Sequence, residues 1–412
     1  MTNQKKLFQY IDLFAGCGGL SDGFEQTQKY SGVAHIEWEK PAAETLRKRL
    51  KTRWNVKDAD KRVMVFDIQR TEELFSGWRD NRFGQHLGLN SLIDRDRGVD
   101  VIIGGPPCQA YSLAGRIRDK NGMRDDYRNY LFESYLAIVS RVQPDVFVFE
   151  NVVGILSAKP GGTMIVDRIK KSFNDAGYLT LDDFRDAKFD LEQFGIPQKR
   201  SRVIIIGLRK EAFKGHNLQV VLKNFYQEFS NEHHVEKIKS AKDALKGLTK
   251  FYPKPIVDLL GKKFSHEPSA SRFLNHSPRY HNPRDIEIFK LLAEDIASGD
   301  MKYQSTTALK RLYTEKTGKE SSVHKYFVIR PNAPSNTIPA HLYKDGLRHI
   351  HWDFNQARSI TVREAARLQT FDDDFEFLGS MGDQYKMIGN AVPPKFARSL
   401  ALSLINLLNL RR

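Results

Sequence analysis

The chain has 412 residues but only two cysteines, Cys17 and Cys108. So few cysteines exclude a disulfide framework and a zinc site built from several cysteines. We therefore expect no bound metal ion, and we expect the protein to act in a reducing compartment such as the cytoplasm.

Long hydrophobic runs are also scarce. The first ten residues, MTNQKKLFQY, contain no apolar core, so we expect no secretory signal. The most apolar segment, LALSLINLLNL at 400–410, is too short to span a bilayer. We predict that this segment is a helix docked onto the body of the protein, and we expect no membrane partner.

Positive charge, in contrast, is abundant. Lys and Arg total 65 against 50 Asp and Glu, a formal net charge of +15. This excess favours a polyanionic partner such as nucleic acid or an acidic membrane, although a basic protein without such a partner is an alternative. Residues 210–350 hold 24 Lys and Arg against 15 Asp and Glu, together with nine of the 12 histidines. The composition of this segment therefore differs from that of the residues before it.

The first half of the chain alternates short apolar runs with amphipathic stretches such as 129–142. Apolar runs without polar alternation are typical of strands buried on both faces. The predicted strands lie within 8–16, 32–38, 63–67, 98–107, 144–152 and 201–208. With helices between these strands, the pattern predicts a doubly wound α/β fold with a mostly parallel, Rossmann-like sheet.

Three segments depart from this rhythm. Residues 69–98 are charged and poorly periodic, which predicts an insertion at the surface. Beyond residue 209 the alternation is lost, and we predict irregular, loop-rich structure. Regularity returns at TVREAARL (361–368), which is typical of a helix start.

A glycine-rich turn, DLFAGCGGLSDGF (12–24), follows the first predicted strand. Glycines at 16, 18 and 19 permit close approach of a ligand to the backbone. Glu37 ends the second predicted strand, where a carboxylate accepts from both hydroxyls of a ribose. Trp38 follows and is able to stack on an adenine, and Asp67 ends the third strand, where it is able to accept from the adenine amino group.

Together these residues predict an adenosine-containing cofactor. The sequence GCGG is not the G-x-G-x-x-G of dinucleotide-binding proteins, which favours S-adenosylmethionine over NAD. Packing of Trp38 in the core is the structural alternative for that residue.

Cys108 lies at the end of a predicted strand, in GGPPCQAYS (104–112), where two prolines stiffen the turn. A free cysteine is most often a small buried hydrophobe, which is the alternative here. Glu150 ends the next buried strand, and Arg200 and Arg202 precede another. A thiol, a carboxyl and arginines beside an adenosine pocket suit nucleophilic attack on an electron-poor ring.

These motifs, in this order, resemble the cytosine-C5 DNA methyltransferase family over nearly the whole chain. The matching blocks are DLFAGCGG (12–19), EW (37–38), GGPPCQAYS (104–112), ENVVG (150–154), QKRSR (198–202), RSITVREAARLQTF (358–371) and QYKMIGNAVPP (384–394). The combination of PPCQ, ENV and Q-x-R-x-R at these spacings is highly specific.

The resemblance implies a role for each catalytic position. Cys108 would attack C6 of a cytosine flipped out of duplex DNA, and Glu150 would contact N3 and the amino group. Arg202 would hold the base oxygen with support from Arg200. The residues implied to line the S-adenosylmethionine site are Phe14, Gly16, Cys17, Gly19, Glu37, Trp38, Asp67, Ile68, Pro107, Leu131, Asn390 and Ala391.

The resemblance also implies two domains. Residues 1–209 with 384–412 would form the catalytic domain that binds S-adenosylmethionine and releases S-adenosylhomocysteine. Residues 210–383 would form a smaller target-recognition domain with a hinge, and its lysines would contact DNA phosphates, although any single lysine has a solvated surface as its alternative. The loop at 111–128 would close over the DNA.

Three departures from the family pattern do not touch the chemistry. Residues 69–98 are longer than a minimal member requires, and TFDDDF (370–375) lacks a proline often found there. Ala114 stands where some relatives carry a serine that enters the helix.

The sequence thus predicts a monomeric DNA cytosine-5 methyltransferase, the modification partner of a restriction endonuclease. An RNA cytosine methyltransferase is the second interpretation, but its relatives carry a CFT-type segment and residues 210–350 contain no cysteine. A catalytically silent DNA-binding module would not need Cys108, Glu150 and Arg202. A nicotinamide oxidoreductase would leave PPCQ unexplained.

Overall fold

The computed structural model describes residues 7–107, 131–159, 162–255, 264–268, 271–320, 326–344 and 346–411. Contacts divide the chain into two compact units. The first comprises Met1–Phe194, Arg200–Glu236 and Ala391–Arg412, and the second comprises Gly195–Lys199 and Lys237–Asn390. Helix α8 (Leu218–His233) therefore belongs to the first unit. The predicted functional domains, 1–209 with 384–412 and 210–383, stay predictions.

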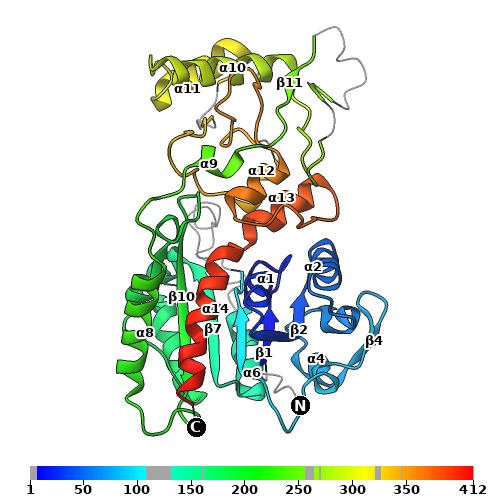
Figure 1. Ribbon diagram of the computed structural model, residues 1–412, viewed down its shortest axis with the longest axis vertical. Helices are drawn as coiled ribbons and strands as arrows, with labels where there is room; N and C mark the ends of the chain where they lie inside the picture. Colours follow the sequence, from blue (N-terminus) through cyan, green and yellow to red (C-terminus); the bar gives the residue numbers. More distant parts are fainter. Residues whose placement is uncertain are drawn as a thin grey trace. The chain divides into compact units, whose positions relative to one another are not determined.

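The first unit is built on an eight-stranded sheet in the order β3-β2-β1-β6-β7-β10-β8, with β9 paired to β10 (Figure 1). The strands are β1 (Phe8–Leu13), β2 (Tyr30–Glu37), β3 (Val63–Val65), β6 (Val101–Gly104), β7 (Val146–Val152), β8 (Tyr178–Leu179), β9 (Lys188–Asp190) and β10 (Ser201–Arg209). The five strands from β3 to β7 in this order are parallel, whereas β10 is antiparallel to β7, β8 and β9. The predicted mostly parallel α/β fold is confirmed.

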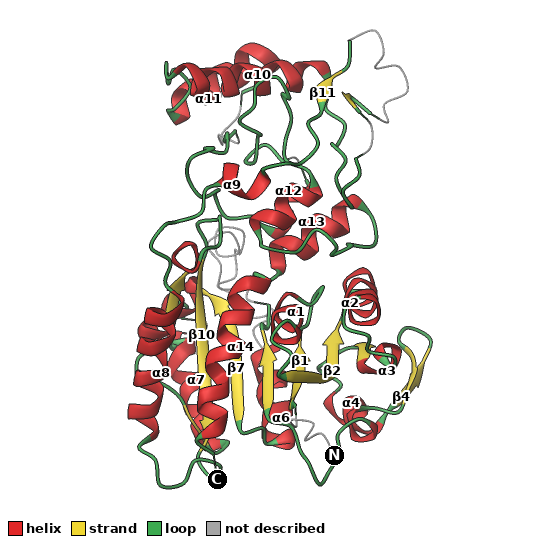
Figure 2. Ribbon diagram, in the orientation of Figure 1, coloured by secondary structure: helices red, strands yellow, loops and turns green. Residues whose placement is uncertain are grey.

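Helices surround this sheet, which explains why its central strands are continuously apolar (Figure 2). These helices are α1 (Gly19–Glu25), α2 (Lys40–Thr52), α3 (Ala59–Arg62), α6 (Leu131–Val142), α7 (Ile165–Asp175), α8 and α14 (Pro394–Asn409). Helix α14 packs against both α1 and α8, and it buries Phe396, Leu400 and Leu404. The predicted docking helix near the end of the chain is thus confirmed.

Residues 69–98 fold into α4 (Thr71–Ser76), a hairpin of β4 (Trp78–Asp80) and β5 (Gly84–His86), and a short 3-10 helix at Leu89–Ser91. The side chains of Leu74, Phe75, Trp78 and Leu89 are buried. The insertion therefore contributes buried apolar side chains, which its charged composition did not reveal.

The second unit contains α9 (Ala241–Leu245), β11 (Tyr252–Pro253) paired with β12 (His266–Glu267), α10 (Pro283–Ser298), α11 (Thr306–Thr317), α12 (Val362–Leu368) and α13 (Met381–Asn390). The helices α8, α10 and α11 show that the prediction of irregular structure after residue 209 is wrong in part. Side chains of Asn282 and Ser305 cap α10 and α11 by accepting from Asp285 N and Ala308 N.

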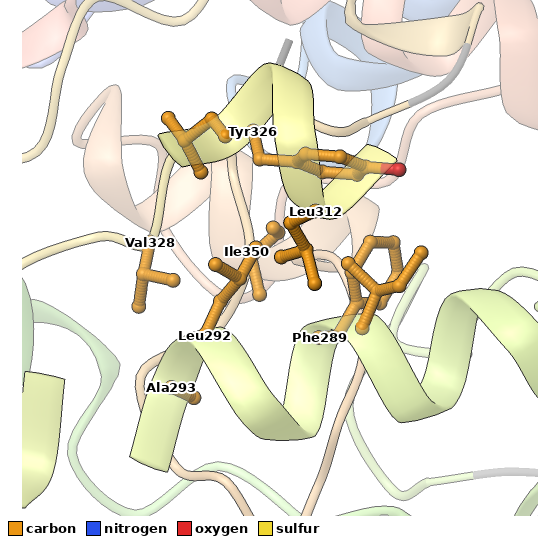
Figure 3. Close-up of a cluster of buried hydrophobic side chains, with 9 residues drawn as sticks. Phe289, Leu292, Ala293, Leu312, Tyr326, Val328 and Ile350 are labelled. Carbon is orange, nitrogen blue, oxygen red and sulfur yellow. The ribbon is translucent and has the colours of Figure 1, made fainter. Parts of the chain in front are cut away.

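Apolar residues at helical spacing on α10 and α11 form the core of this part of the second unit. Figure 3 shows Phe289 and Leu292 of α10 facing Leu312 of α11, with Ala293, Val328 and Ile350 in the same cluster. Helix α12 begins where the sequence predicts, with Thr361 as its N-cap. Among the described residues, none of the helices has the length and hydropathy of a membrane span.

Candidate active site

The glycine turn after β1 runs through backbone angles that favour glycine. Phe14, Gly16 and Gly18 have φ values of 60°, 57° and 92°. Gly18 N donates to Ala15 O at 2.9 Å, which closes the turn before α1 begins at Gly19. The turn thus presents backbone at the carboxyl end of β1, the edge at which α/β folds bind ligands.

Gly19 lies directly against the segment that follows α13. A Cβ at Gly19 would lie 2.3 Å from the carbonyl oxygen of Val392 and 3.2 Å from the Cβ of Ala391. No side chain fits there, because the obstacle is backbone. Ala391 and the glycine turn, which are far apart in the sequence, therefore lie together. Asn390 is the last residue of the second unit.

Glu37 connects the end of β2 to this turn. Its Oε2 accepts from Gly16 N at 2.7 Å, and its Oε1 accepts from Glu39 N at 2.7 Å. Burial raises the pKa of Glu37, while these backbone N–H groups act in the opposite direction. Both carboxylate oxygens are thus held in a fixed orientation at the carboxyl end of the strand.

The other predicted adenosine residues follow β2 and β3. Trp38 is 44% exposed, so the alternative that it packs in the core is wrong. Asp67 is partly buried and accepts from Gln69 N at 3.1 Å, and the neighbouring Ile68 is buried. An exposed indole, a carboxylate and an apolar side chain are suited to an adenine.

A buried polar cluster lies beneath the glycine turn. Ser21 Oγ donates to Asp12 Oδ2 at 2.6 Å and lies 2.9 Å from His35 Nδ1. Burial raises the pKa of Asp12 to about 7 and lowers the pKa of His35 to about 3. Cys17 is also buried, and burial raises the pKa of its thiol. Cys17 is therefore a protonated thiol and a poor nucleophile.

Glu150 and Arg202 meet at the ends of β7 and β10. Arg202 Nε lies 2.6 Å from Glu150 Oε1, and the two side chains are 13% and 11% exposed. The antiparallel register pairs Arg202 with Val152 and Ile204 with Glu150, so the ion pair forms across a diagonal. The structure thus brings together two of the predicted catalytic residues.

Arg200 lies in the same region but is more deeply buried. Its Nη2 donates to Ala391 O at 3.0 Å. Burial lowers the pKa of Arg200, the positive charge of Arg202 lowers it further, and Glu150 acts in the opposite direction. Arg200 therefore connects the arginine–glutamate pair to the segment that contacts the glycine turn.

The turn that leads to Cys108 begins against Glu150. A Cβ at Gly105 would lie 2.6 Å from Glu150 Oε2, and Asn151 Nδ2 is 3.5 Å from Pro106 O. Pro107 is exposed. Cys108 itself, Ala114 and the predicted closing loop at 111–128 lie outside the described residues. After this segment, Leu131 is buried at the start of α6.

Sequence reasoning missed two contributors to this site. Asn151 is 2% exposed and approaches the proline turn, and its place directly after Glu150 in ENVVG was the available signal. Ser21 links Asp12 to His35, but no sequence pattern indicates that these three side chains meet.

The histidines of 210–350 divide between the surface and the interior, and His216, His234 and His341 are exposed. His266, His276, His281 and His349 are buried, and burial lowers the pKa of each. His276 Nδ1 lies 2.8 Å from Thr361 Oγ1, and His281 Nε2 lies 3.2 Å from Ser359 N. These four histidines therefore lie in the interior of the second unit and do not contribute to a basic surface.

Comparison with known proteins agrees with this arrangement. The model of the family described as C-5 cytosine-specific DNA methylase matches residues 8–406. The chain therefore belongs to the C-5 cytosine-specific DNA methylase family. It is accordingly a DNA cytosine-5 methyltransferase.

Individual relatives match along almost the whole chain. The type II methyltransferase M.Bpa9945I of Bacillus paralicheniformis is 35% identical, over 97% of this chain and 99% of its own length. The type II methyltransferase M.Eco47II of Escherichia coli is 30% identical, over 98% and 80%. The S. pombe Dnmt2 methyltransferase shares the fold, with a TM-score of 0.53 at 16% identity over 98% and 99% of the two chains.

Proposed function

We propose that this protein transfers a methyl group from S-adenosylmethionine to C5 of a flipped-out cytosine in a specific short duplex sequence, through a covalent bond between Cys108 and C6. The observation that carries the proposal is the buried Glu150–Arg202 ion pair beside Gly105, three residues before Cys108. A carboxyl and a guanidinium match the hydrogen-bonding groups that a cytosine ring presents.

The residues around the glycine turn fit S-adenosylmethionine. Glu37 would accept from the ribose hydroxyls, since both its oxygens are already oriented by backbone N–H groups. Trp38 and Ile68 would contact the adenine, and Asp67 would accept from its amino group. Among the described residues no heavy atom lies within 4 Å of a Cβ placed on Gly16, so the backbone there is open to close approach of a ligand. When bound, the cofactor supplies an electrophilic methyl group.

The protein's own residues would then activate the base. The Cys108 thiolate adds to C6, and the electron pair of the C5–C6 double bond moves toward C5 and the ring. Glu150 holds N3 and the amino group, and Arg202 holds the base oxygen with Arg200 behind it. C5 takes the methyl group, and S-adenosylhomocysteine is left as the product. Loss of the C5 proton to a base then restores the double bond and expels the thiolate.

Cys17 does not compete with Cys108 for this role. Burial keeps the Cys17 thiol protonated, whereas addition to C6 requires a thiolate. A pyrimidine inside the stack exposes neither face to a nucleophile, so the target cytosine must leave the duplex. The segment at 111–128 would close over the DNA at this stage.

The remaining parts of the proposal concern DNA recognition. Residues 210–383 would recognise the target sequence, with lysine contacts to phosphates giving affinity and a few side chains giving specificity. The protein would act as a monomer. Because M.Bpa9945I and M.Eco47II are type II methyltransferases, we propose that this protein protects DNA against a cognate restriction endonuclease.

Bisulfite sequencing tests the proposal. Plasmid DNA from cells expressing the protein should contain protected cytosines within one short motif, and DNA from cells expressing Cys108→Ser should contain none. The variant should still melt at the wild-type temperature and bind S-adenosylhomocysteine. A soluble, cofactor-binding wild type that protects no cytosine would contradict the proposal, as would protection by Cys108→Ser.

A further inference from the structure

Residues 69–98 have no role in the function proposed above, yet their hairpin contacts the adenosine residues. The turn between β4 and β5 carries Arg82 and Phe83. Arg82 Cζ lies 4.3 Å from the centroid of the Trp38 ring and above its face. The Phe83 ring meets the same indole at a centroid distance of 5.6 Å and an interplanar angle of 62°. The insertion thus covers part of Trp38.

Aromatic stacking anchors the hairpin to the sheet. Phe66, directly before Asp67, stacks on Trp78 of β4 with centroids 3.8 Å apart, and it meets Phe83 at 5.3 Å. On β5, His86 Nε2 lies 2.8 Å from Lys61 O at the end of α3. The hairpin therefore contacts both segments, after β2 and after β3, that supply the predicted adenosine residues.

Hydrogen bonds fix the conformation of the turn itself. Asp80 Oδ1 accepts from Arg82 N at 2.9 Å and from Phe83 N at 2.6 Å. Trp78 Nε1 donates to Phe83 O at 3.2 Å, and Arg70 Nη1 donates to Asp80 Oδ2 at 2.7 Å. The N–H of Phe83 and the Arg70 guanidinium lower the pKa of Asp80. The turn is therefore held in one geometry before any ligand arrives.

We propose that the hairpin is an added wall of the cofactor site, in which Arg82 and Phe83 position Trp38 for the adenine. Arg82 covers one face of the indole by a cation–π contact and Phe83 meets the indole in a T-shaped contact, so the face away from Arg82 receives the base. Trp38 is 44% exposed with both contacts in place, which agrees with an open side. This inference rests on S-adenosylmethionine being the cofactor.

The energetic reason is preorganisation. A solvent-exposed indole samples several rotamers, and a ligand that selects one of them loses affinity in doing so. Contacts with a fixed turn remove this loss before binding. Arg82 and Phe83 are positioning residues in this account, because they act through Trp38.

The test measures binding of S-adenosylhomocysteine to the full-length protein by calorimetry. Arg82→Ala should weaken binding about threefold, the size expected for an exposed cation–π contact. Phe83→Ala should weaken it about tenfold. The KM for S-adenosylmethionine should rise in parallel, while kcat at saturation stays at the wild-type value. Gln85→Ala on the same hairpin is the matched control, since its side chain is exposed, and it should bind as wild type does.

A double-mutant cycle separates this role from general support of the fold. In a Trp38→Ala background, Arg82→Ala should have no further effect on affinity, since its only route to the ligand is the indole. Equal affinity of Arg82→Ala, Phe83→Ala and wild type for S-adenosylhomocysteine would contradict the proposed role of the hairpin. An equally large loss of affinity from Arg82→Ala in the Trp38→Ala background would contradict it as well. A wild-type protein that binds neither S-adenosylmethionine nor S-adenosylhomocysteine would instead contradict the proposed function, and therefore also the proposed role of the hairpin.

Discussion

Arg202 Nε lies 2.6 Å from Glu150 Oε1, so the guanidinium orients the Glu150 carboxyl at the ends of β7 and β10. We expect Glu150→Gln to keep the shape of the site but to lose the carboxyl that is proposed to hydrogen-bond to N3 and the amino group of the cytosine. The kcat for methyl transfer should fall by about 10²- to 10⁴-fold, the usual range for acid–base or charge-stabilising groups.

Binding of S-adenosylhomocysteine by this variant should be unchanged, because Glu37 and Trp38 lie on other strand ends. Glu211→Gln, at an exposed position paired with Lys214, is the control and should retain full activity. A Glu150→Gln enzyme with wild-type kcat would exclude the proposed role of Glu150.

The buried carboxyl of Asp12 should make the stability of the protein depend on pH. Burial raises its pKa from 3.8 to about 7, so the folded protein binds this proton more tightly than the unfolded chain does. The stability that Asp12 contributes is therefore complete below about pH 4 and is lost as the pH rises through about 7. Asp12→Asn retains an oxygen for the Ser21 hydroxyl but cannot ionise.

The free energy of unfolding of Asp12→Asn, compared with that of wild type, should therefore be higher at about pH 8 than at about pH 5, by on the order of a few kcal/mol. Chemical denaturation at the two pH values measures this difference. Glu25 and His35 titrate in both proteins, so their effects cancel in the comparison. An identical change with pH in both proteins would show that Asp12 does not titrate in this range.

A capping box and a buried ion pair stabilise the start of helix α12. Thr361 and Glu364 form a capping box, and Arg358 Nη1 and Nη2 each donate to Glu364 at 2.7 Å. Burial alone would raise the pKa of Glu364, but the Arg358 guanidinium more than offsets this and lowers it. Both side chains are almost completely buried, at 0% and 2% exposure.

Arg358→Ala would leave the Glu364 charge buried without this partner, and should destabilise the protein by about 3–5 kcal/mol. Arg311→Ala, which breaks the exposed Arg311–Glu315 pair on α11, is the control and should leave the denaturant midpoint close to that of wild type. Denaturant midpoints for the two variants provide the comparison. Similar shifts in both would refute a special role for the buried pair.

Elements also show how far sequence reasoning extends. Strands such as β7 were predictable because a short, uninterrupted apolar run is typical of a strand buried on both faces. The antiparallel direction of β10 was not predictable, since an apolar run does not indicate whether the strand is parallel or antiparallel to its neighbours. Helix α10 was missed although Ile288, Phe289 and Leu292 are helically spaced, because proline- and histidine-rich flanks obscured the pattern. The three-residue strands of the 69–98 hairpin are too short for any periodicity.

The placement of the site residues at strand ends was predictable, because the strands themselves were predictable. Glu150 and Arg202 follow from the rule that ligands bind at strand ends, but their direct pairing depends on the register of β7 and β10. The contact between Gly19 and Val392 joins residues from opposite ends of the chain, which a local pattern does not indicate.

At the scale of the whole molecule, the net charge of +15 leads to a prediction about salt. Binding to DNA should weaken steeply with ionic strength, because neutralising phosphates releases condensed counterions. A protein with roughly six to ten phosphate contacts loses about 10³- to 10⁵-fold in affinity between about 50 and 200 mM salt. Fluorescence anisotropy with a labelled duplex measures the slope, and a flat dependence would contradict phosphate binding by the basic residues.

The central claim is a covalent bond between Cys108 and the target cytosine. A duplex with 5-fluorocytosine at the methylated position tests it directly, since fluorine does not leave C5 as a proton does and the adduct cannot resolve. With S-adenosylmethionine, wild-type protein should give a complex that survives denaturing electrophoresis, and Cys108→Ala should give none. A persistent complex with Cys108→Ala, or its absence with an active wild type, would contradict the account.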